Sequence, residues 1–232
     1  MIRHGQASFG TDNYDRLSPL GHRQCELAGS HLRNLGIRFD AVYSGRLARQ
    51  QSSAESLAKG YSDHAGTLPE PLVDNAFDEY NADNIFKAYL PRVLAEDEEL
   101  SSMETSIYAD RELFQRAFSQ VMDAWVKSEP HGQNTLESWP DFLERVDSGL
   151  RRIISEQERT ANVVAVTSGG PIAVAIMSAL GMPDGQAMRL NYGIYNSSIT
   201  RLRIGRSSRR LMGFNDIAHL ELEKESGLVS FR

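Results

Sequence analysis

The stretch that most constrains the fold is residues 162–167, which read Asn-Val-Val-Ala-Val-Thr. β-Branched residues occupy four of the six positions, as is typical of a strand that is buried on both faces. Ser168-Gly169-Gly170-Pro171 follows at once, and residues 172–180 then predict an apolar helix that ends at Gly181. A strand that passes through glycines into a helix is the repeating unit of parallel sheets. We therefore expect an α/β protein.

The same order of strand, small residues and helix recurs along the chain. We expect strands at residues 39–43 and 162–167, an edge strand within 67–73, and an edge hairpin over 195–204 and 209–214. We expect helices from the Ser18 cap to Gly36, at 46–59 with an end at Gly60, from Ser138 to Ile153, and at 172–180. These elements predict a three-layer α/β/α sandwich around a mostly parallel sheet.

A helical region interrupts the alternation of strands and helices between residues 84 and 128. Its strongest apolar stripe, interpreted as core packing, is Phe114, Phe118, Val121, Met122 and Trp125. We interpret the region as an insertion that covers the edge of the sheet. No repeat or low-complexity linker divides the chain, so we expect one domain over residues 1–232.

The first strand is unusually short, because only Met1 and Ile2 precede Arg3. Central strands usually have about five or six residues. The expectation is that this strand is clipped or that the true start lies upstream.

Composition excludes several classes of function. The 25 Lys and Arg residues against 31 Asp and Glu residues give a net charge of −6, which argues against a nucleic-acid partner. Cys25 is the single cysteine, so the chain cannot form an intramolecular disulfide or a cysteine zinc cluster. No apolar run reaches the length of a membrane span, and no secretory signal opens the sequence. We expect a cytoplasmic protein, and its oligomeric state is left open.

Arginine side chains gather where these strands end. Arg3 and His4 follow Ile2 at the end of the first strand, and Arg46 and Arg49 stand near the start of the second helix. Open α/β sheets bind ligands at the carboxyl ends of their strands, and helix N-termini favour anions. A neutral imidazole can attack phosphorus while cations hold the oxygens. The pattern indicates a phosphate site.

Four ordered motifs make the sequence resemble the histidine phosphatase superfamily, also called the phosphoglycerate mutase-like family. They are Arg3-His4-Gly5, the segment Leu17–Gly21, the segment Ser44–Arg49 followed by Ser53-Ala54, and Leu136-Glu137-Ser138 followed by Arg145-Val146. They span most of the chain, and the ordered set is more specific than any one of them.

The resemblance implies a role for each matching residue. His4 would carry the phosphoryl group, and Arg3 and Arg49 would bind its oxygens. Glu79 would be the general acid, with Asp74 as the alternative. We expect no metal and no cofactor, because the sequence has one cysteine, scattered histidines and no His/Asp cluster at the spacing of metal ligands.

One position departs from the family. Where the family has a second histidine before two glycines, this chain has Ser168, followed by Gly169 and Gly170. A serine hydroxyl and the adjacent backbone amides can still bind a phosphoryl oxygen, so Ser168 and Gly169 are candidate phosphate ligands. Serine brings no positive charge, however, so we expect slower chemistry. His219 lies too far along the chain to be an obvious substitute and is interpreted as structural.

The resulting hypothesis is metal-independent hydrolysis of a small phosphomonoester through a phosphohistidine. Two alternatives stay open. One is phosphoryl transfer of the phosphoglycerate mutase type. The other is a pseudophosphatase that binds phosphorylated ligands without turnover, for which Ser168 and the short first strand would argue.

Overall fold

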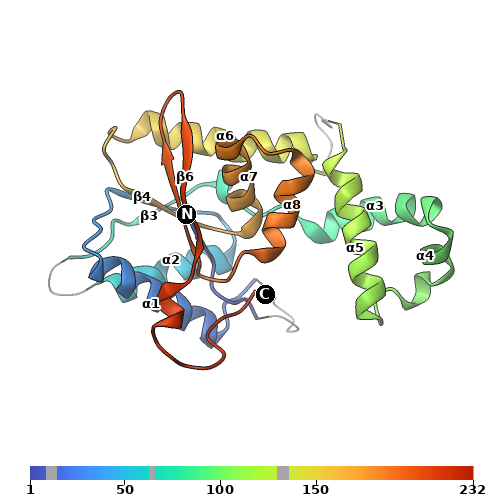
Figure 1. Ribbon diagram of the computed structural model, residues 1–232, viewed down its shortest axis with the longest axis horizontal. Coiled ribbons are helices and arrows are strands. Elements are labelled where there is room, and N and C mark those ends of the chain that lie inside the picture. Colours follow the sequence, from blue (N-terminus) through green and yellow to red (C-terminus); the bar gives the residue numbers. More distant parts are fainter. Residues whose placement is uncertain (9–14, 63–65, 130–135, 232) are drawn as a thin grey trace. The chain divides into compact units, whose positions relative to one another are not determined.

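The computed structural model describes residues 1–8, 15–62, 66–129 and 136–231 (Figure 1). It divides into two compact units. Unit 1 is Met1–Glu79 together with Val146–Arg232, and unit 2 is Tyr80–Arg145. The expectation of one domain over residues 1–232, with an insertion at about 84–128, stays a prediction.

Unit 1 is built on a sheet whose strand order, in the described residues, is β3-β2-β4-β1-β5-β6. The strands are β1 (Ile2–Arg3), β2 (Ala41–Ser44), β3 (Pro71–Val73), β4 (Val163–Thr167), β5 (Ile199–Ile204) and β6 (Arg209–Asp216). β1 to β4 run parallel to one another, and β5 and β6 form an antiparallel hairpin at one edge. The predicted edge hairpin and the edge position of β3 are confirmed.

Helices cover both faces of this sheet (Figure 1). They are α1 (Pro19–Asn34), α2 (Ala48–Tyr61), α6 (Trp139–Glu156, which begins in unit 2), α7 (Gly169–Leu180), α8 (Asp184–Gly193) and α9 (Ala218–Glu221), with the short 3-10 helix η1 (Asn75–Phe77). Apolar residues of α1 and α2 pack on one side of the strands, and α7 packs with β6 on the other. The predicted three-layer α/β/α architecture is confirmed.

Local signals explain where α1 begins. The Ser18 hydroxyl accepts a hydrogen bond from the Gly21 N–H at 3.0 Å, and Pro19 occupies the first helical position. Both features were expected from the sequence. The first N–H groups of a helix need an acceptor from outside the helix, and proline has no N–H that would need one.

The predicted bounds of α2 were wrong at both ends. It begins at Ala48 rather than Arg46, and the Arg46 backbone N–H donates instead to Asp78 at 2.5 Å. It also continues through Gly60 to Tyr61. A Cβ at Gly60 would lie 1.9 Å from the Glu26 carbonyl oxygen of α1. Gly60 therefore allows α1 and α2 to approach each other closely, and it does not end the helix.

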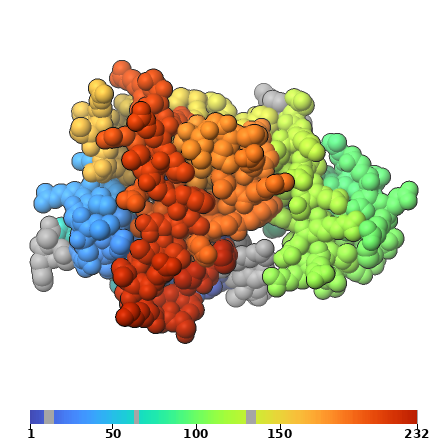
Figure 2. All heavy atoms as spheres, viewed as in Figure 1, coloured from blue at the N-terminus to red at the C-terminus, as the bar shows by residue number. Residues whose placement is uncertain are grey.

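α8 was not predicted. Its residues 184–193 are mostly polar and exposed, and only Ala187 and Met188 are buried. The sequence therefore lacks a clear apolar stripe there. The hairpin that follows lies at the surface (Figure 2), where the Met212 and Phe214 side chains are exposed.

Unit 2 is helical. Its elements are α3 (Ala82–Glu96), α4 (Glu98–Ser102), the 3-10 helix η2 (Glu104–Ser106), α5 (Arg111–Val126) and the first two turns of α6. Trp125 of α5 packs against Trp139 and Phe142 of α6, with ring centroids 5.2 and 5.8 Å apart. Phe114, in contrast, is 37% exposed, so the predicted core stripe holds only for the C-terminal half of α5.

No helix within the described parts of the chain is both long enough and apolar enough to span a bilayer.

Candidate active site

His4 directly follows β1, and its backbone is fixed on both sides. Its N–H donates to the Thr167 carbonyl at the end of β4, at 2.7 Å. Its carbonyl accepts from the Ser197 N–H and from the Asn196 Nδ2, both at 3.2 Å. The residue is only 4% exposed. The ring is thus carried by backbone that the sheet holds in place.

Hydrogen bonds determine which ring nitrogen of His4 carries the proton. Nδ1 lies 2.7 Å from the Gly5 carbonyl oxygen, which can only accept, so Nδ1 is the donor. Nε2 then keeps its lone pair and accepts from Arg49 Nε at 3.3 Å. Burial, followed by the charges of Arg3 and Arg49, holds the pKa of His4 well below its usual value. The ring is therefore neutral at physiological pH.

The guanidinium of Arg49 is oriented by Asp15. One carboxylate oxygen of Asp15 accepts from Arg49 Nη1 at 2.7 Å. The other accepts from the Ala48 N–H at 2.8 Å, which satisfies an amide at the start of α2. Sequence reasoning gave Asp15 no role, because nothing in a polar loop indicates which distant helix it will cap.

A serine links the end of β1 to the same helix. The Gly5 N–H donates to Ser53 Oγ at 3.0 Å, and this hydroxyl donates to the Arg49 carbonyl at 2.6 Å. Gly5 is also confined sterically, because a Cβ there would lie 2.2 Å from the Gly21 carbonyl oxygen of α1. The end of β1 and the first turns of α1 and α2 therefore pack so closely that larger side chains would not fit between them.

Arg3, the last residue of β1, is half-buried. Its Nη1 donates to the Ile194 carbonyl, in the segment between α8 and β5. Its charge contributes to the lowered pKa of His4, as that of Arg49 does. The structure therefore brings Arg3, His4 and Arg49 together, as the strand-end reasoning expected.

Ser168 stands at the N-cap position of α7, but its hydroxyl makes no capping hydrogen bond. Instead it accepts from Gln50 Nε2 at 2.8 Å. The same Nε2 also donates to the Phe77 carbonyl at 2.9 Å. Gln50 is a second residue that sequence reasoning missed, since its partner is 118 positions away. Beside it, Gly169 approaches α8 so closely that a Cβ would lie 1.9 Å from Asn191 Oδ1.

The two candidate acids have different surroundings. Glu79 Oε2 accepts from the Gly170 N–H at 3.1 Å, so its carboxylate lies at the start of α7, two residues beyond Ser168. Asp74 accepts from Arg152 Nη1 at 2.5 Å and from the Ala76 N–H at 2.9 Å. The Asp74 carboxylate thus caps η1 and pairs with α6.

Two further polar residues named in the sequence have structural partners. The Arg46 side chain is exposed and pairs with Asp78 at 2.7 Å. His219 is buried, and its Nε2 lies 2.9 Å from Ser197 Oγ. Burial lowers the pKa of His219 to about 4.

Sequence similarity shows the family to which the chain belongs. The sequence model of the histidine phosphatase superfamily (branch 1) matches residues 1–86 and 84–217. The chain belongs to this superfamily. Within it, a 2,3-bisphosphoglycerate-dependent phosphoglycerate mutase from Bartonella quintana (strain Toulouse) is 29% identical over 82 residues. That match covers 33% of this chain and 38% of the mutase, so it spans well under half of either protein.

Two solved structures of phosphatases share the fold. A mycobacterial glucosyl-3-phosphoglycerate phosphatase in complex with VO3 superposes with a TM-score of 0.62 at 20% identity, covering 93% of this chain and 97% of that one. A phosphoserine phosphatase variant from Entamoeba histolytica, in complex with phosphoserine, gives a TM-score of 0.56 at 18% identity, covering 94% and 96%. At these identities the likeness shows the fold alone.

Proposed function

We propose that the chain hydrolyses small phosphomonoesters through a phosphohistidine on His4. The observation that carries the proposal is the neutral His4 ring, whose Nε2 lone pair faces Arg49 Nε at 3.3 Å while Nδ1 is bound to Gly5. A neutral imidazole of fixed orientation is a nucleophile, and the guanidinium beside it can bind phosphoryl oxygens.

Two displacement steps account for the reaction. In the first, His4 Nε2 forms a bond to phosphorus while the bond from phosphorus to the ester oxygen breaks, and Glu79 protonates the departing alkoxide. In the second, water attacks the phosphohistidine, Glu79 accepts a proton from that water, and His4 is released neutral. Arg3 and Arg49 stabilise the charge on the equatorial oxygens in both steps.

At this site Ser168 contributes a neutral hydroxyl, and its hydrogen-bond partner Gln50 contributes a neutral amide. A hydrogen bond to a charged group contributes about 1.5–3 kcal/mol, against roughly 0.5–1.5 kcal/mol for a neutral one. A difference of about 1.4 kcal/mol that is realised only in the transition state changes a rate roughly tenfold. We therefore propose a slower phosphatase than one with a second histidine, and not an inactive one.

The 82-residue similarity to a phosphoglycerate mutase supports a second candidate, phosphoryl transfer between two positions of a phosphoglycerate. The two reactions share the phosphohistidine and differ in its acceptor. A mutase returns the phosphoryl group to bound product, whereas a phosphatase passes it to water and releases inorganic phosphate.

Trapping the intermediate tests the proposal. Rapid quench with a labelled aryl phosphate should yield an acid-labile, base-stable phosphoenzyme, and His4→Ala should abolish it. Phosphate release should exceed one equivalent per chain and should survive chelating agents, since no step uses a metal. His22→Ala, at an exposed histidine, is the matched control and should keep the label.

Three other outcomes would contradict the proposal. Label retained in His4→Ala would move the nucleophile elsewhere. Isomerisation of phosphoglycerate without phosphate release would favour the mutase. Phosphate binding with neither label nor turnover would favour a pseudophosphatase.

A further inference from the structure

The hairpin formed by β5 and β6 carries a concentration of positive charge. Every charged residue from Ile199 to Phe214 is an arginine, and these residues are Arg201, Arg203, Arg206, Arg209 and Arg210. The chain as a whole has a net charge of −6. The hairpin is therefore a basic element on an acidic protein.

Two of these arginines have acidic partners. Arg209 Nη1 donates to Asp147 and, at 2.6 Å, to Ser178 Oγ. Arg201 Nη2 lies 4.0 Å from Asp216, which makes a long ion pair. The guanidinium groups of Arg203, Arg206 and Arg210, in contrast, have no hydrogen bond or ion pair with any residue that the structure describes. Their charges are available to a binding partner.

Arg203 and Arg210 face each other across the hairpin, and both are exposed. Residues directly opposite in an antiparallel pair have Cβ atoms about 4.5–5.5 Å apart on the same face, and like charges there destabilise the pair. A carboxylate bound by the two guanidinium groups would offset this repulsion. An acidic ligand would therefore stabilise the hairpin.

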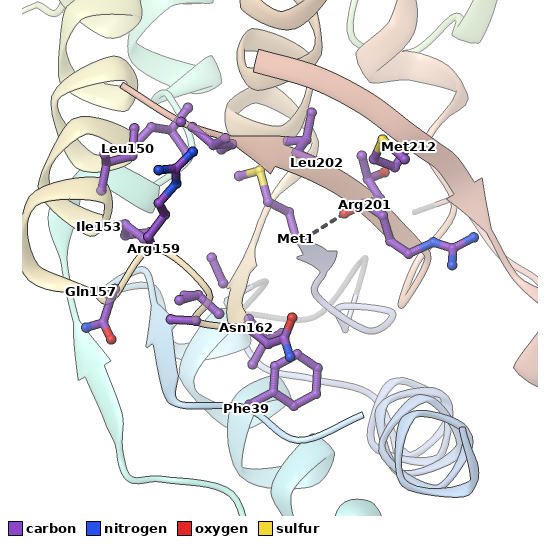
Figure 3. Close-up of a pocket in the computed structure, with 18 of the residues that line it drawn as sticks. Met1, Phe39, Leu150, Ile153, Gln157, Arg159, Asn162, Arg201, Leu202 and Met212 are labelled. Atoms are coloured by element: carbon purple, nitrogen blue, oxygen red, sulfur yellow. Dashed lines mark hydrogen bonds between the residues drawn. The ribbon is translucent and has the colours of Figure 1, made fainter. Parts of the chain in front are cut away.

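The face of the hairpin that carries Arg203 and Arg210 is open to solvent. Met212, which follows on β6, is 60% exposed. The Arg201 side chain is 58% exposed, and Figure 3 shows it extending away from Phe39 and Asn162. Side chains alternate between the two faces of a strand, so Leu211 lies on the opposite face, where it packs with the apolar side chains of α7.

The outer edge of β6 offers backbone hydrogen bonds next to this charge. β6 is the last strand of the sheet. The Gly205 N–H donates to the Ser208 carbonyl at 2.8 Å, and hydrogen-bonded pairs alternate with non-hydrogen-bonded pairs along an antiparallel ladder. The backbone groups of Arg210 therefore face β5. Those of Arg209 and Leu211 face outward, where no described residue bonds to them.

We propose that this hairpin is a docking site for an extended acidic segment of another protein, which adds to the outer edge of β6 as a further strand. Its backbone would bond to Arg209 and Leu211. Acidic side chains at alternate positions would lie beside Arg210 and reach Arg203. Apolar side chains at the positions between them would extend the face on which Leu211 packs.

A second copy of this chain does not suit the same edge. Pairing of two β6 strands would bring two sets of arginines together, and charges on edge strands are a usual means of preventing such self-association. A partner of opposite charge has no such repulsion and can still bond to the outward backbone groups. The surface therefore selects acidic strands.

Two peptides test the proposal against the 232-residue chain. The probe is acetyl-Glu-Val-Glu-Val-Glu-Val-Glu-amide, and the control has lysine in place of each glutamate. The acidic peptide should bind, and its Kd should rise about tenfold or more between about 50 and 500 mM NaCl, because salt screens exposed charges. It should also slow amide exchange at Arg209 and Leu211. The lysine peptide should not bind.

The double variant Arg203→Gln/Arg210→Gln locates the binding site. It should weaken binding of the acidic peptide by about tenfold or more. Its Tm should stay the same or rise, because the like charges that face each other are gone. The matched control, Arg111→Gln/Arg189→Gln, changes the net charge equally at exposed arginines outside the hairpin and should bind as the parent chain does.

A third peptide separates strand addition from attraction by charge alone. N-methylation of its three valines keeps the charge but removes the N–H groups that would bond to β6, and binding should weaken by about tenfold or more. Equal binding of the methylated peptide would overturn the proposal. So would no binding of the acidic peptide, equal binding of the lysine peptide, or full binding by Arg203→Gln/Arg210→Gln. These readouts do not depend on turnover, so this test and the phosphoenzyme test can fail separately.

Discussion

The two ring nitrogens of His4 make different hydrogen bonds. Nδ1 is committed to the Gly5 carbonyl at 2.7 Å, and this bond sets both the orientation of the ring and the tautomer. Nε2 is left to accept from Arg49, on the side where a phosphoryl group would be bound. A side chain that reproduces only one of these two hydrogen bonds cannot replace the imidazole of His4.

The proposed role of Glu79 as proton donor can be tested by changing a single atom of its side chain. In Glu79→Gln, the side-chain oxygen can still accept from the Gly170 N–H, but the group can no longer protonate an alkoxide. We expect kcat for alkyl phosphates to fall by about 10²–10⁴-fold, the usual contribution of general acid catalysis. Aryl phosphates, whose leaving groups need little protonation, should lose less than about tenfold.

Asp74→Asn is the control for that experiment. It should lower Tm, because Asp74 pairs with Arg152 and caps η1, while the ratio between alkyl and aryl substrates should stay unchanged. Equal losses for both substrate types in Glu79→Gln would assign a positioning role to Glu79.

Sequence reasoning reached the residues whose positions follow from local structure. Arg3 and His4 stand at the end of a strand and Arg49 near the start of a helix, and such ends meet at one edge of a parallel sheet. Asp15 and Gln50 were not predicted, because their hydrogen-bond partners lie 33 and 118 positions away in the sequence. Neither a polar loop nor a helix interior indicates so distant a partner. Long-range hydrogen bonds of this kind leave no periodic trace in a sequence.

Among the elements, α2 carries the most site residues, and a carboxylate from another segment stabilises its start. Asp15→Ala removes the acceptor of the Ala48 N–H and the partner of Arg49. Loss of such a cap costs about 1 kcal/mol, so we expect Tm to fall by roughly 2–4 °C. Because Arg49 also loses its orientation, kcat/KM should fall by about tenfold or more.

Asp15→Asn separates the two effects. Its amide oxygen can still accept from the helix N–H, so Tm should stay near that of the parent chain, while the charge that orients Arg49 is gone. Thermal unfolding and steady-state kinetics of both variants check the expectation. Full activity in Asp15→Ala would show that Arg49 is positioned without it.

Tertiary contacts also explain the errors in the predicted ends of the helices. Gly60 was expected to end α2, yet the helix continues to Tyr61 because the missing side chain admits the Glu26 carbonyl of α1. The strands and the first helix were recognised because β-branched runs and Ser-Pro caps act locally. Contacts between helices become visible only in the folded chain.

For the whole molecule, buried neutral histidines predict a loss of stability in acid. Burial lowers the pKa of His219 to about 4 and that of His4 well below its usual value. In the unfolded chain both should titrate near 6.5. Between pH 6.5 and 4 the unfolded state therefore binds more protons, and the free energy of unfolding falls as the pH is lowered.

Replacing one of these histidines should flatten that dependence. His219→Asn should lessen the loss of unfolding free energy between pH 6.5 and 4 by up to about 3 kcal/mol. Urea unfolding at pH 7, 6, 5 and 4.5 measures the change. Parallel profiles for His219→Asn and the parent chain would exclude His219 as a source of acid sensitivity.

The strand order also determines when the segment that carries His4, the proposed nucleophile, can join the sheet. β1 precedes its two neighbours in the chain, because β4 and β5 are encoded only in the last third of these 232 residues. Until then the segment that carries His4 lacks both of its partner strands, and α1 and α2 can pack only against each other and against β2. Contacts so distant in sequence form slowly and leave apolar segments exposed in nascent chains. The strand that ends beside His4 would thus be synthesised long before its partner strands and would be among the last parts to fold.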